Sequence, residues 1–245
     1  MGALTKTFSF LFVVIAVNLP CSAWADEDSN VTHSPTSEIY VQDRISLQLV
    51  SGAIFSPTVF ASRTPVMNYA QTNLRLGWMI NRPGRVGFLP RGNLEAILEL
   101  TNSIIYKGPG NYMGGLTALI RYNFVPKDSR FVPYIQAGAG IVYTDAYKDR
   151  TQNAIGNSVE FTPQASVGCH YMINRNWSIS AEAIFHHISN AGLDHRNRGI
   201  NAFGGFIGVT YYFDRTWNSS HPTCEILPFS DKETCHEVRT EKPQG

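Results

Sequence analysis

The feature of this sequence that most constrains its fold is an alternation of apolar and polar residues that recurs in one segment after another. In "NLRLGWMI" (73–80), the side chains of Leu74, Leu76 and Trp78 share one face, and that of Arg75 lies on the other. Successive side chains of a β-strand point to opposite faces, so a period of two residues indicates strands with one apolar and one polar face. We therefore predict an all-β protein.

Segments of this kind cover most of the chain. Short polar turns between them alternate with longer connections, as in antiparallel barrels. Two architectures fit: a soluble β-sandwich or lipocalin-like barrel, and an eight-stranded antiparallel transmembrane β-barrel of the outer-membrane type. The predicted strands are 40–54, 69–81, 92–105, 112–125, 131–145, 158–172, 175–189 and 199–213.

Three features favour the membrane-spanning barrel. The segments run for about 10 to 14 residues, which is long for a strand of a soluble sheet but suits a tilted membrane crossing. Aromatic residues gather near the strand ends, as in the girdles at membrane interfaces. The last segment, "GGFIGVTYYF" (204–213), closes on an aromatic residue, Phe213. We therefore expect a barrel of the bacterial outer membrane.

The beginning of the chain is predicted to direct export. Lys6, the apolar run "FSFLFVVIAV" (8–17) and the small residues of "SAWA" (22–25) follow one another in the order of a secretory signal peptide, so residues 1–25 are expected to be removed. Without Lys6, the 20 Lys and Arg residues become 19, which balances 19 Asp and Glu. A near-neutral chain gives no indication of nucleic-acid binding.

The end of the chain is predicted to lie outside the barrel, which then spans 26–213. Residues 214–245 are polar, contain three prolines and show no periodicity, so we expect a periplasmic tail. Cys224 and Cys235 could form a disulfide there, because an exported protein meets an oxidising compartment.

Charged residues fall in the phase opposite to the aliphatic ones. The interior of an eight-stranded barrel is filled by side chains, so in a membrane barrel these charges would form a buried ion network rather than a pore. A soluble sandwich would invert the arrangement, with the aliphatic residues buried and the charges in water. The residues concerned are Arg75, Glu95, Glu99, Arg121 and Glu182.

Polar residues are concentrated between the last two predicted strands, in "HHISNAGLDHRN" (186–197). An even-stranded barrel keeps both termini in the periplasm, so this connection is expected at the outer leaflet, which is rich in lipopolysaccharide. Counting along the strands places His187, Ser189 and Asn201 on the lipid-facing side and His186 on the lumen side. Polar groups on a lipid face cost free energy, so their presence calls for a function.

The spacing of these residues fits nucleophilic catalysis. Residues two apart on a strand lie on one face, about 6.5–7 Å apart along the backbone, so His187 could act as a base for the Ser189 hydroxyl. Asn201 on the neighbouring strand could fix the orientation of the ring. The alternative is an interfacial His and Ser without a chemical role. We expect no metal site, because His186 and His187 point to opposite faces.

The string "HISNAGLDHRNRGIN" (187–201) resembles the PagL family of outer-membrane lipid A 3-O-deacylases, which carries H-x-S-N-A-G-L, then an Asn, then Gly-Ile and an acidic residue. The resemblance implies hydrolysis of the ester-linked hydroxyacyl chain at position 3 of lipid A, with Ser189 as the nucleophile and His187 as the base. It also implies an oxyanion pocket shaped by Asn190, Ala191, Gly192 and Asn197.

The chain departs from the family at one position, because Asn201 stands where the family has a glutamate that orients the histidine. An amide oxygen can accept a hydrogen bond from histidine Nδ1, but it cannot stabilise an imidazolium by charge. In the triad of a serine protease, an Asp→Asn change lowers turnover about 10⁴-fold. Three outcomes stay open: slow catalysis with Asn201, catalysis with Asp194 as a substitute, and lipid binding without turnover.

We therefore predict a carboxylic ester hydrolase of the outer membrane that acts on lipid A and needs no cofactor. The alternative is a non-catalytic outer-membrane barrel with a structural, adhesive or lipopolysaccharide-binding role. The expected partners are lipopolysaccharide and other outer-membrane lipids, with a homodimer left open and no nucleic acid. Substitution of Ser189 separates the two functions, since a structural barrel does not require its hydroxyl.

Overall fold

The structure of the chain, a computed structural model, describes residues 36, 39–57, 65–86, 88–127 and 129–214. All of them belong to one of the two compact units into which the chain divides, His33–Gly245. The predicted signal peptide, the tail from residue 215 onward and the Cys224–Cys235 pair lie outside the described residues.

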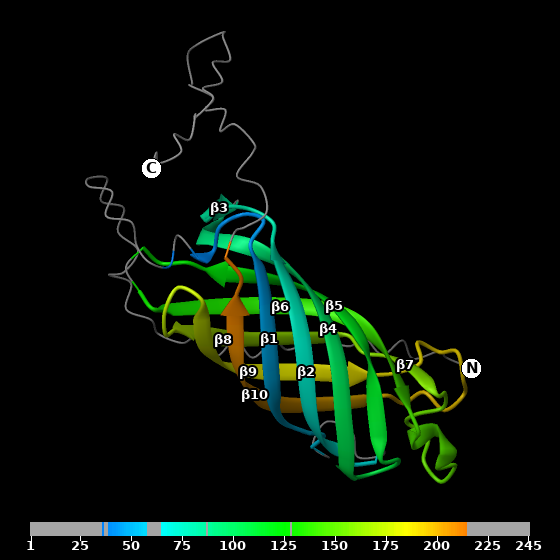
Figure 1. The fold of residues 1–245 in the computed structure, drawn as a ribbon. Coiled ribbons are helices and arrows are strands. Elements are labelled where there is room, and N and C mark those ends of the chain that lie inside the picture. The colour runs from blue at the N-terminus through cyan, green and yellow to red at the C-terminus, as the bar shows by residue number, and fades with distance from the viewer. Residues whose placement is uncertain (1–35, 37–38, 58–64, 87, 128, 215–245) are drawn as a thin grey trace, which may run out of the picture. The chain divides into compact units, whose positions relative to one another are not determined.

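Eight long antiparallel strands close into a barrel (Figure 1). Their order around the barrel is β2, β1, β10, β9, β8, β6, β5, β4, and pairing between β2 and β4 closes the ring. The strands are β1 (Ile45–Phe55), β2 (Asn68–Met79), β4 (Leu89–Lys107), β5 (Tyr112–Phe124), β6 (Phe131–Thr144), β8 (Gln164–Met172), β9 (Trp177–Ile188) and β10 (Ile200–Tyr212).

Three short elements extend the barrel at its ends. Strand β3 (Gly84–Val86) pairs with β4, and β7 (Val159–Phe161) pairs with β6. A 3-10 helix, η3 (Ala146–Lys148), lies in the connection between β6 and β7, which we call the β6–β7 loop (145–158). No helix in the described part of the chain is long and apolar enough to cross a membrane.

The eight predicted strands are confirmed, with two corrections. The first strand begins at Ile45 rather than at residue 40, because Asp43 adopts a left-handed turn (φ 65°) and Tyr40 is fully buried among residues at the end of the barrel. The predicted segment 158–172 is divided into β7 and β8, and Pro163, which has no N–H to donate, lies at the break.

The aliphatic faces of the strands point out of the barrel. Leu76 and Trp78 on β2 are 50% and 56% exposed, whereas Arg75, whose side chain points into the lumen, is 1% exposed. A soluble protein would expose the charged residue and bury its aliphatic neighbours. This orientation is that of a membrane-spanning barrel, and it excludes the soluble β-sandwich.

The lumen is filled by the predicted ion network. Arg75 Nε lies 2.6 Å from Glu99 Oε2, and Arg75 Nη1 lies 2.7 Å from Glu182 Oε2. Arg121 Nη1 lies 3.3 Å from Glu95 Oε2. All five side chains are buried, so the interior is a packed polar layer and not a pore, as predicted.

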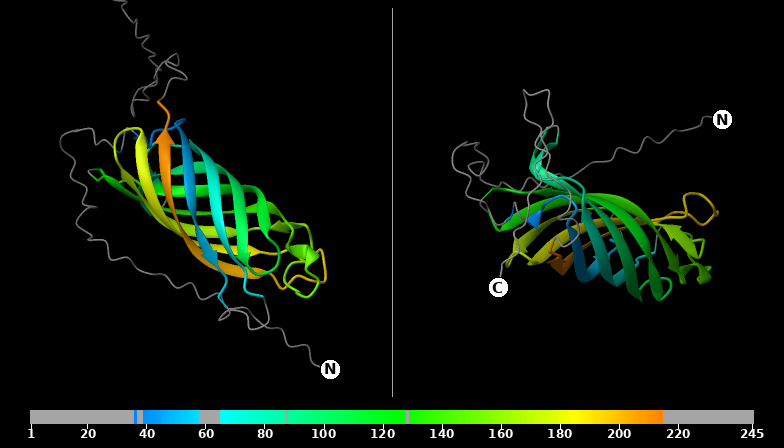
Figure 2. Two further views of the ribbon diagram at one scale, coloured as in Figure 1. Left: turned by 60° about the horizontal axis from the view of Figure 1, so that its bottom comes forward. Right: turned by 45° about the horizontal axis from the view of Figure 1, so that its top comes forward.

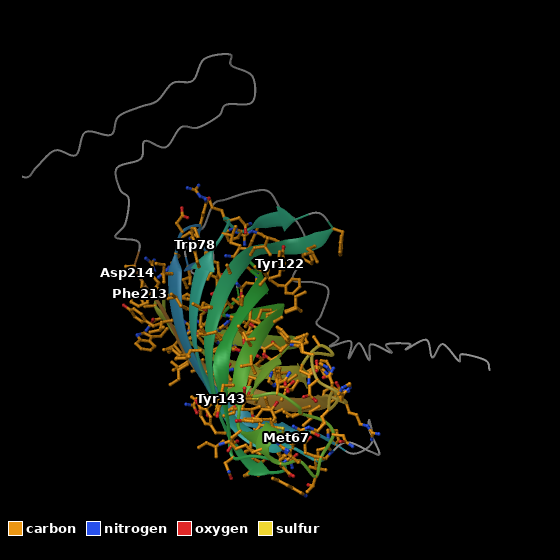
Figure 3. The ribbon with its side chains drawn as sticks, turned by 90° about the vertical axis from the view of Figure 1, so that its right-hand side faces the viewer. Met67, Trp78, Tyr122, Tyr143, Phe213 and Asp214 are labelled. Atoms are coloured by element: carbon orange, nitrogen blue, oxygen red, sulfur yellow. The ribbon has the colours of Figure 1, made fainter. Side chains whose placement is uncertain are left out.

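Apolar layers close the lumen above and below the ion network. At the end that carries the described termini, the Tyr40 and Tyr212 hydroxyls are 3.0 Å apart within a cluster that includes Ile39. Ile188 and Ile200 belong to a second cluster at the opposite end, which we call the loop end. In Figure 3, Trp78 and Phe213 mark the first end, and Tyr143 and Met67 mark the loop end.

Candidate active site

The candidate site lies at the loop end, where β9 ends and β10 begins. The register places Asn201 directly opposite His187, and His187 Nδ1 lies 2.6 Å from Asn201 Oδ1. Both side chains are on the outer surface, in phase with Phe185 and Phe203, whose ring centroids are 5.0 Å apart. The structure thus brings together the predicted base and the amide predicted to orient it.

The direction of this amide decides what the histidine can do. With its oxygen facing the ring, Asn201 accepts a hydrogen bond, so Nδ1 of His187 carries the proton. The lone pair of Nε2 is then available to accept a proton from a nucleophile. If the amide nitrogen faced the ring, the tautomer would be reversed and Nε2 could not act as a base.

Ser189 directly follows β9, and its backbone is held by β7. Its N–H donates to the carbonyl of Phe161 (3.1 Å), and its own carbonyl accepts from the N–H of Phe161 (2.7 Å). The side chain is half-buried and points, like His187, to the outer surface. Within the described part of the chain, no hydrogen bond joins the Ser189 hydroxyl to the His187 ring, so the hydroxyl is available to a group from outside.

Asn190 organises the connection that follows, the β9–β10 loop (189–199). It is fully buried, and its N–H donates to Asn197 Oδ1 at 2.8 Å. Its side-chain oxygen accepts from the N–H of Gly192 at 3.0 Å, and its Nδ2 donates to the carbonyl of Arg196 at 3.2 Å. Ala191 (φ 55°) and Gly192 (φ 88°) adopt left-handed conformations, which such an internal network can enforce.

Two of the four residues predicted to shape an oxyanion pocket direct their main-chain donors into this network. The N–H groups of Asn190 and Gly192 are bonded inside the loop. Among the described residues, the N–H of Ala191 and the Nδ2 of Asn197 donate to no partner. Because the Asn197 oxygen is fixed by the backbone, its NH₂ group is directed away from that bond and is a candidate donor to a developing oxyanion.

Two further predicted residues lie away from the His187 ring. Asp194, considered as a substitute carboxylate, accepts a hydrogen bond from the N–H of Arg196 at 2.7 Å. No bond between Asp194 and His187 occurs among the described residues. His186 faces the lumen as predicted, where its Nδ1 lies 2.6 Å from the hydroxyl of Tyr69.

Gly199 was not predicted as part of the site. It has a left-handed backbone (φ 66°), and a Cβ atom built on it would come within 2.9 Å of Cε1 and 3.3 Å of Nε2 of His187. Only glycine lets the backbone approach the ring so closely. Gly199 belongs to the Gly-Ile pair of the motif and directly precedes the last strand, but neither feature indicated which side chain it would face.

A groove runs along the outer surface near the site. It has a volume of about 650 Å³, and small residues of β1, β9 and β10 line much of it. Ala183 and Gly205, which pair with each other and contribute to this lining, lie four residues before His187 and four residues after Asn201, with the Phe185–Phe203 pair in between. Because Gly205 has no side chain and Ala183 a single methyl group, the surface beside the site is hollowed and apolar.

Comparisons with known proteins give one family match. A family model described as "Lipid A 3-O-deacylase (PagL)" matches residues 67–210. No curated protein sequence matched the chain.

Several solved structures are similar to this chain. The outer membrane enzyme PagL is 21% identical with a TM-score of 0.46, and the match covers 66% of this chain and 97% of that one. Neisserial surface protein A is 14% identical with a TM-score of 0.47, and the match covers 69% of this chain and 97% of that one. The N-terminal β-barrel domain of Pseudomonas aeruginosa OprF is 15% identical with a TM-score of 0.44, and the match covers 70% of this chain and 98% of that one. None of these comparisons supports the homodimer.

Proposed function

The chain belongs to the PagL family of lipid A 3-O-deacylases, since the family model matches more than half of it, and on that premise we propose that it hydrolyses the 3-O-linked hydroxyacyl ester of lipid A. As a member of this family it is a protein of the bacterial outer membrane. In our proposal, Ser189 is the nucleophile, His187 is the general base and Asn201 orients the base.

The reaction follows from these roles. The Ser189 oxygen attacks the ester carbonyl of the acyl chain while Nε2 of His187 takes the hydroxyl proton. The tetrahedral intermediate collapses, the bond from the carbonyl carbon to the sugar oxygen breaks, and that oxygen receives the proton from Nε2. Water then repeats the sequence on the acyl-serine, which releases the fatty acid and restores the Ser189 hydroxyl.

The observation that carries the proposal is the 2.6 Å contact between His187 Nδ1 and Asn201 Oδ1 on the lipid-facing surface. A His–Asn pair on the outer surface does not contribute to the packing of the barrel interior. Because its hydrogen bond uses Nδ1, the Nε2 lone pair stays available to a nucleophile. An amide oxygen can fix the tautomer, although it supplies no charge. We therefore expect turnover that is slower than a carboxylate would allow.

The surroundings of the pair support an acyl ester as substrate. The apolar groove beside Phe185 and Phe203 offers space for a hydrocarbon chain. Arg44, near the start of the described chain, donates to the carbonyl of Phe213, so both described ends lie at the end of the barrel away from the site. If the termini are periplasmic, the site lies in the outer leaflet, where lipid A is found.

Mass spectrometry of lipid A from cells that express this chain tests the proposal. We expect a mass loss equal to one hydroxyacyl chain, which should be absent in cells that express Ser189→Ala at the same level in the outer membrane. Unchanged lipid A with a correctly folded wild-type barrel would contradict it. That result would favour the alternative of a barrel that binds lipopolysaccharide without turnover. The observation that favours this alternative is Asn201, whose side chain carries no charge to stabilise the imidazolium.

A further inference from the structure

The side chain of one arginine connects the β6–β7 loop to the β9–β10 loop through three hydrogen bonds. The guanidinium of Arg196 donates to the carbonyls of Tyr147 (3.2 Å), Asp149 (3.2 Å) and Gly156 (3.1 Å). Three of the five N–H donors of the guanidinium are thus used on the backbone of the neighbouring loop. The two loops lie at the same end of the barrel in both views of Figure 2.

Main-chain hydrogen bonds extend this contact toward the catalytic strand. The N–H of Arg198 donates to the carbonyl of Asn153 (3.1 Å), and the N–H of Gly199 donates to the carbonyl of Ala154 (3.2 Å). The β6–β7 loop therefore sets the position of the residue that packs against His187. Its influence reaches the ring through one peptide unit.

The β6–β7 loop is itself well anchored. The side-chain oxygen of Gln152 accepts from the N–H groups of Ala154 (2.7 Å) and Ile155 (2.9 Å), and its Nε2 donates to the carbonyl of Ile155 (2.8 Å). Ala154 and Ile155 are fully buried in the apolar cluster that also contains Ile188 and Ile200, at the ends of the two catalytic strands. A loop that is fixed in this way can hold the residues bonded to it, Arg198 and Gly199, in defined positions.

The His187 ring is consequently held from two sides. Asn201 bonds Nδ1, and Gly199 lies so close beside the ring that a Cβ atom there would come within 2.9 Å of Cε1. A hydrogen bond to a neutral amide is roughly half as strong as one to a carboxylate. With Asn201 as the orienting group, the packing against Gly199 carries more of the task of holding the ring.

We propose that the β6–β7 loop is a positioning element for the catalytic base, and that Arg196 is the positioning residue that holds Gly199 against the His187 ring. This inference rests on the proposed function. It assigns to Arg196 an indirect role, since its guanidinium is bonded to main-chain carbonyls and not directed at the substrate. The loop thereby contributes to the orientation of the ring, for which Asn201 supplies only a neutral hydrogen bond.

Steady-state deacylation of lipid A by the purified, folded full chain tests the inference. Arg196→Ala should lower kcat by about 10- to 100-fold, because a displacement of about 1 Å at a catalytic group has effects of that size, and should change KM less than twofold. Arg150→Ala, which removes an exposed arginine of the same loop, is the matched control and should leave both constants unchanged. A raised KM with unchanged kcat in Arg196→Ala would show contact with lipid A phosphate instead and would overturn the inference, as would unchanged kinetics.

Gly199→Ala provides a second route, since a methyl group suffices to push against the ring. It should lower kcat at least as much as Arg196→Ala while the barrel still shows the heat-dependent gel mobility of a folded outer-membrane protein. Wild-type kcat in this folded variant would also overturn the inference.

Hydrogen exchange keeps the inference separate from the proposed function, because it does not depend on turnover. The amides of Arg198 and Gly199 should exchange at least about tenfold faster in Arg196→Ala than in the wild type or in Arg150→Ala. If the wild type has no deacylase activity, the proposed function fails, and the exchange rates still decide whether Arg196 and the β6–β7 loop hold Gly199 in place. Equal exchange in all three proteins would show that they do not.

Discussion

The lumen and the outer face of this barrel both contain polar residues, but the two sets differ in how many hydrogen-bond partners they have. In the lumen, Glu182 is bonded to Arg75 at 2.7 Å and also accepts from Tyr134 and Gln136, so its carboxylate is saturated with donors. On the outer face, His187 has one side-chain partner, Asn201. Among the described residues, the Ser189 hydroxyl is bonded to neither His187 nor Asn201.

The difference indicates what each set of residues is for. A buried charge that loses its partner costs several kcal/mol, which is why the charged residues of the lumen are paired with one another. A polar group on the lipid face near the membrane interface costs less free energy than an unpaired buried charge. It can therefore remain without a partner and available for reaction. Stability should therefore depend on the lumen and turnover on the outer face, which the following variants test.

The two adjacent histidines separate the two regions most sharply. His187→Gln should lower turnover by at least about 10⁴-fold, because the base of a Ser–His system is lost, while the midpoint of urea unfolding stays unchanged. His186→Gln, one residue away but in contact with Tyr69 in the lumen, should keep turnover within about threefold. Deacylation kinetics and urea titration of the folded proteins give both readouts. Similar losses of turnover in the two variants would contradict the division.

Breaking the luminal network should have the converse effect. Arg75→Met leaves Glu99 and Glu182 buried without their cation, so the free energy of unfolding should fall by about 3–5 kcal/mol. Arg82→Met, at an exposed turn, should change it by less than about 0.5 kcal/mol. Equilibrium unfolding in urea measures both. Equal stability of the two variants would mean that the ion network adds nothing to the fold.

Restoring a carboxylate should strengthen the outer site. Asn201→Glu is expected to raise kcat by about 10- to 100-fold, since a charged partner stabilises the imidazolium that forms during the reaction. Asn201→Leu, which keeps the size but removes the acceptor, should lower kcat instead. Initial rates with lipid A micelles distinguish these outcomes. If the glutamate variant is no faster, the orienting group does not limit turnover.

The smallest effect is expected from filling the groove. A side chain at Gly205 meets only the carbonyl of Glu182, at 3.3 Å from its Cβ, so Gly205→Leu should fold and project into the groove. We expect KM to rise about tenfold with kcat nearly constant, because a pocket contact of this size is worth about 1–3 kcal/mol. Gly205→Ala is the control and should change KM less than twofold. An unchanged KM in the leucine variant would remove the groove from the account.

The fold was predictable because a period of two residues survives along every strand. Leu76 and Arg75 had to lie on opposite faces of β2 whatever the architecture, and the strand length and closing aromatic residue indicated which face meets lipid. The errors fell at boundaries. Tyr40 continued the alternation but turns into the end of the barrel, and Pro163 interrupts a strand that the apolar pattern extends across.

The site was predictable only as far as the strands carry it. Alternation and register placed His187 opposite Asn201, because both residues belong to paired strands. Arg196 and Gly199 could not be assigned, because their partners lie in an aperiodic loop about 40 to 50 positions earlier in the chain. Contacts between two such loops depend on the closed barrel, and no local pattern encodes them.

Covalent labelling of the purified wild-type barrel with a fluorophosphonate tests the central claim most directly, because the reagent traps an activated serine. We predict one adduct, located by peptide mapping on Ser189, and its loss in His187→Gln but not in His186→Gln. An absence of adduct on the folded wild-type protein, or an adduct on Ser189 that persists in His187→Gln, would contradict it.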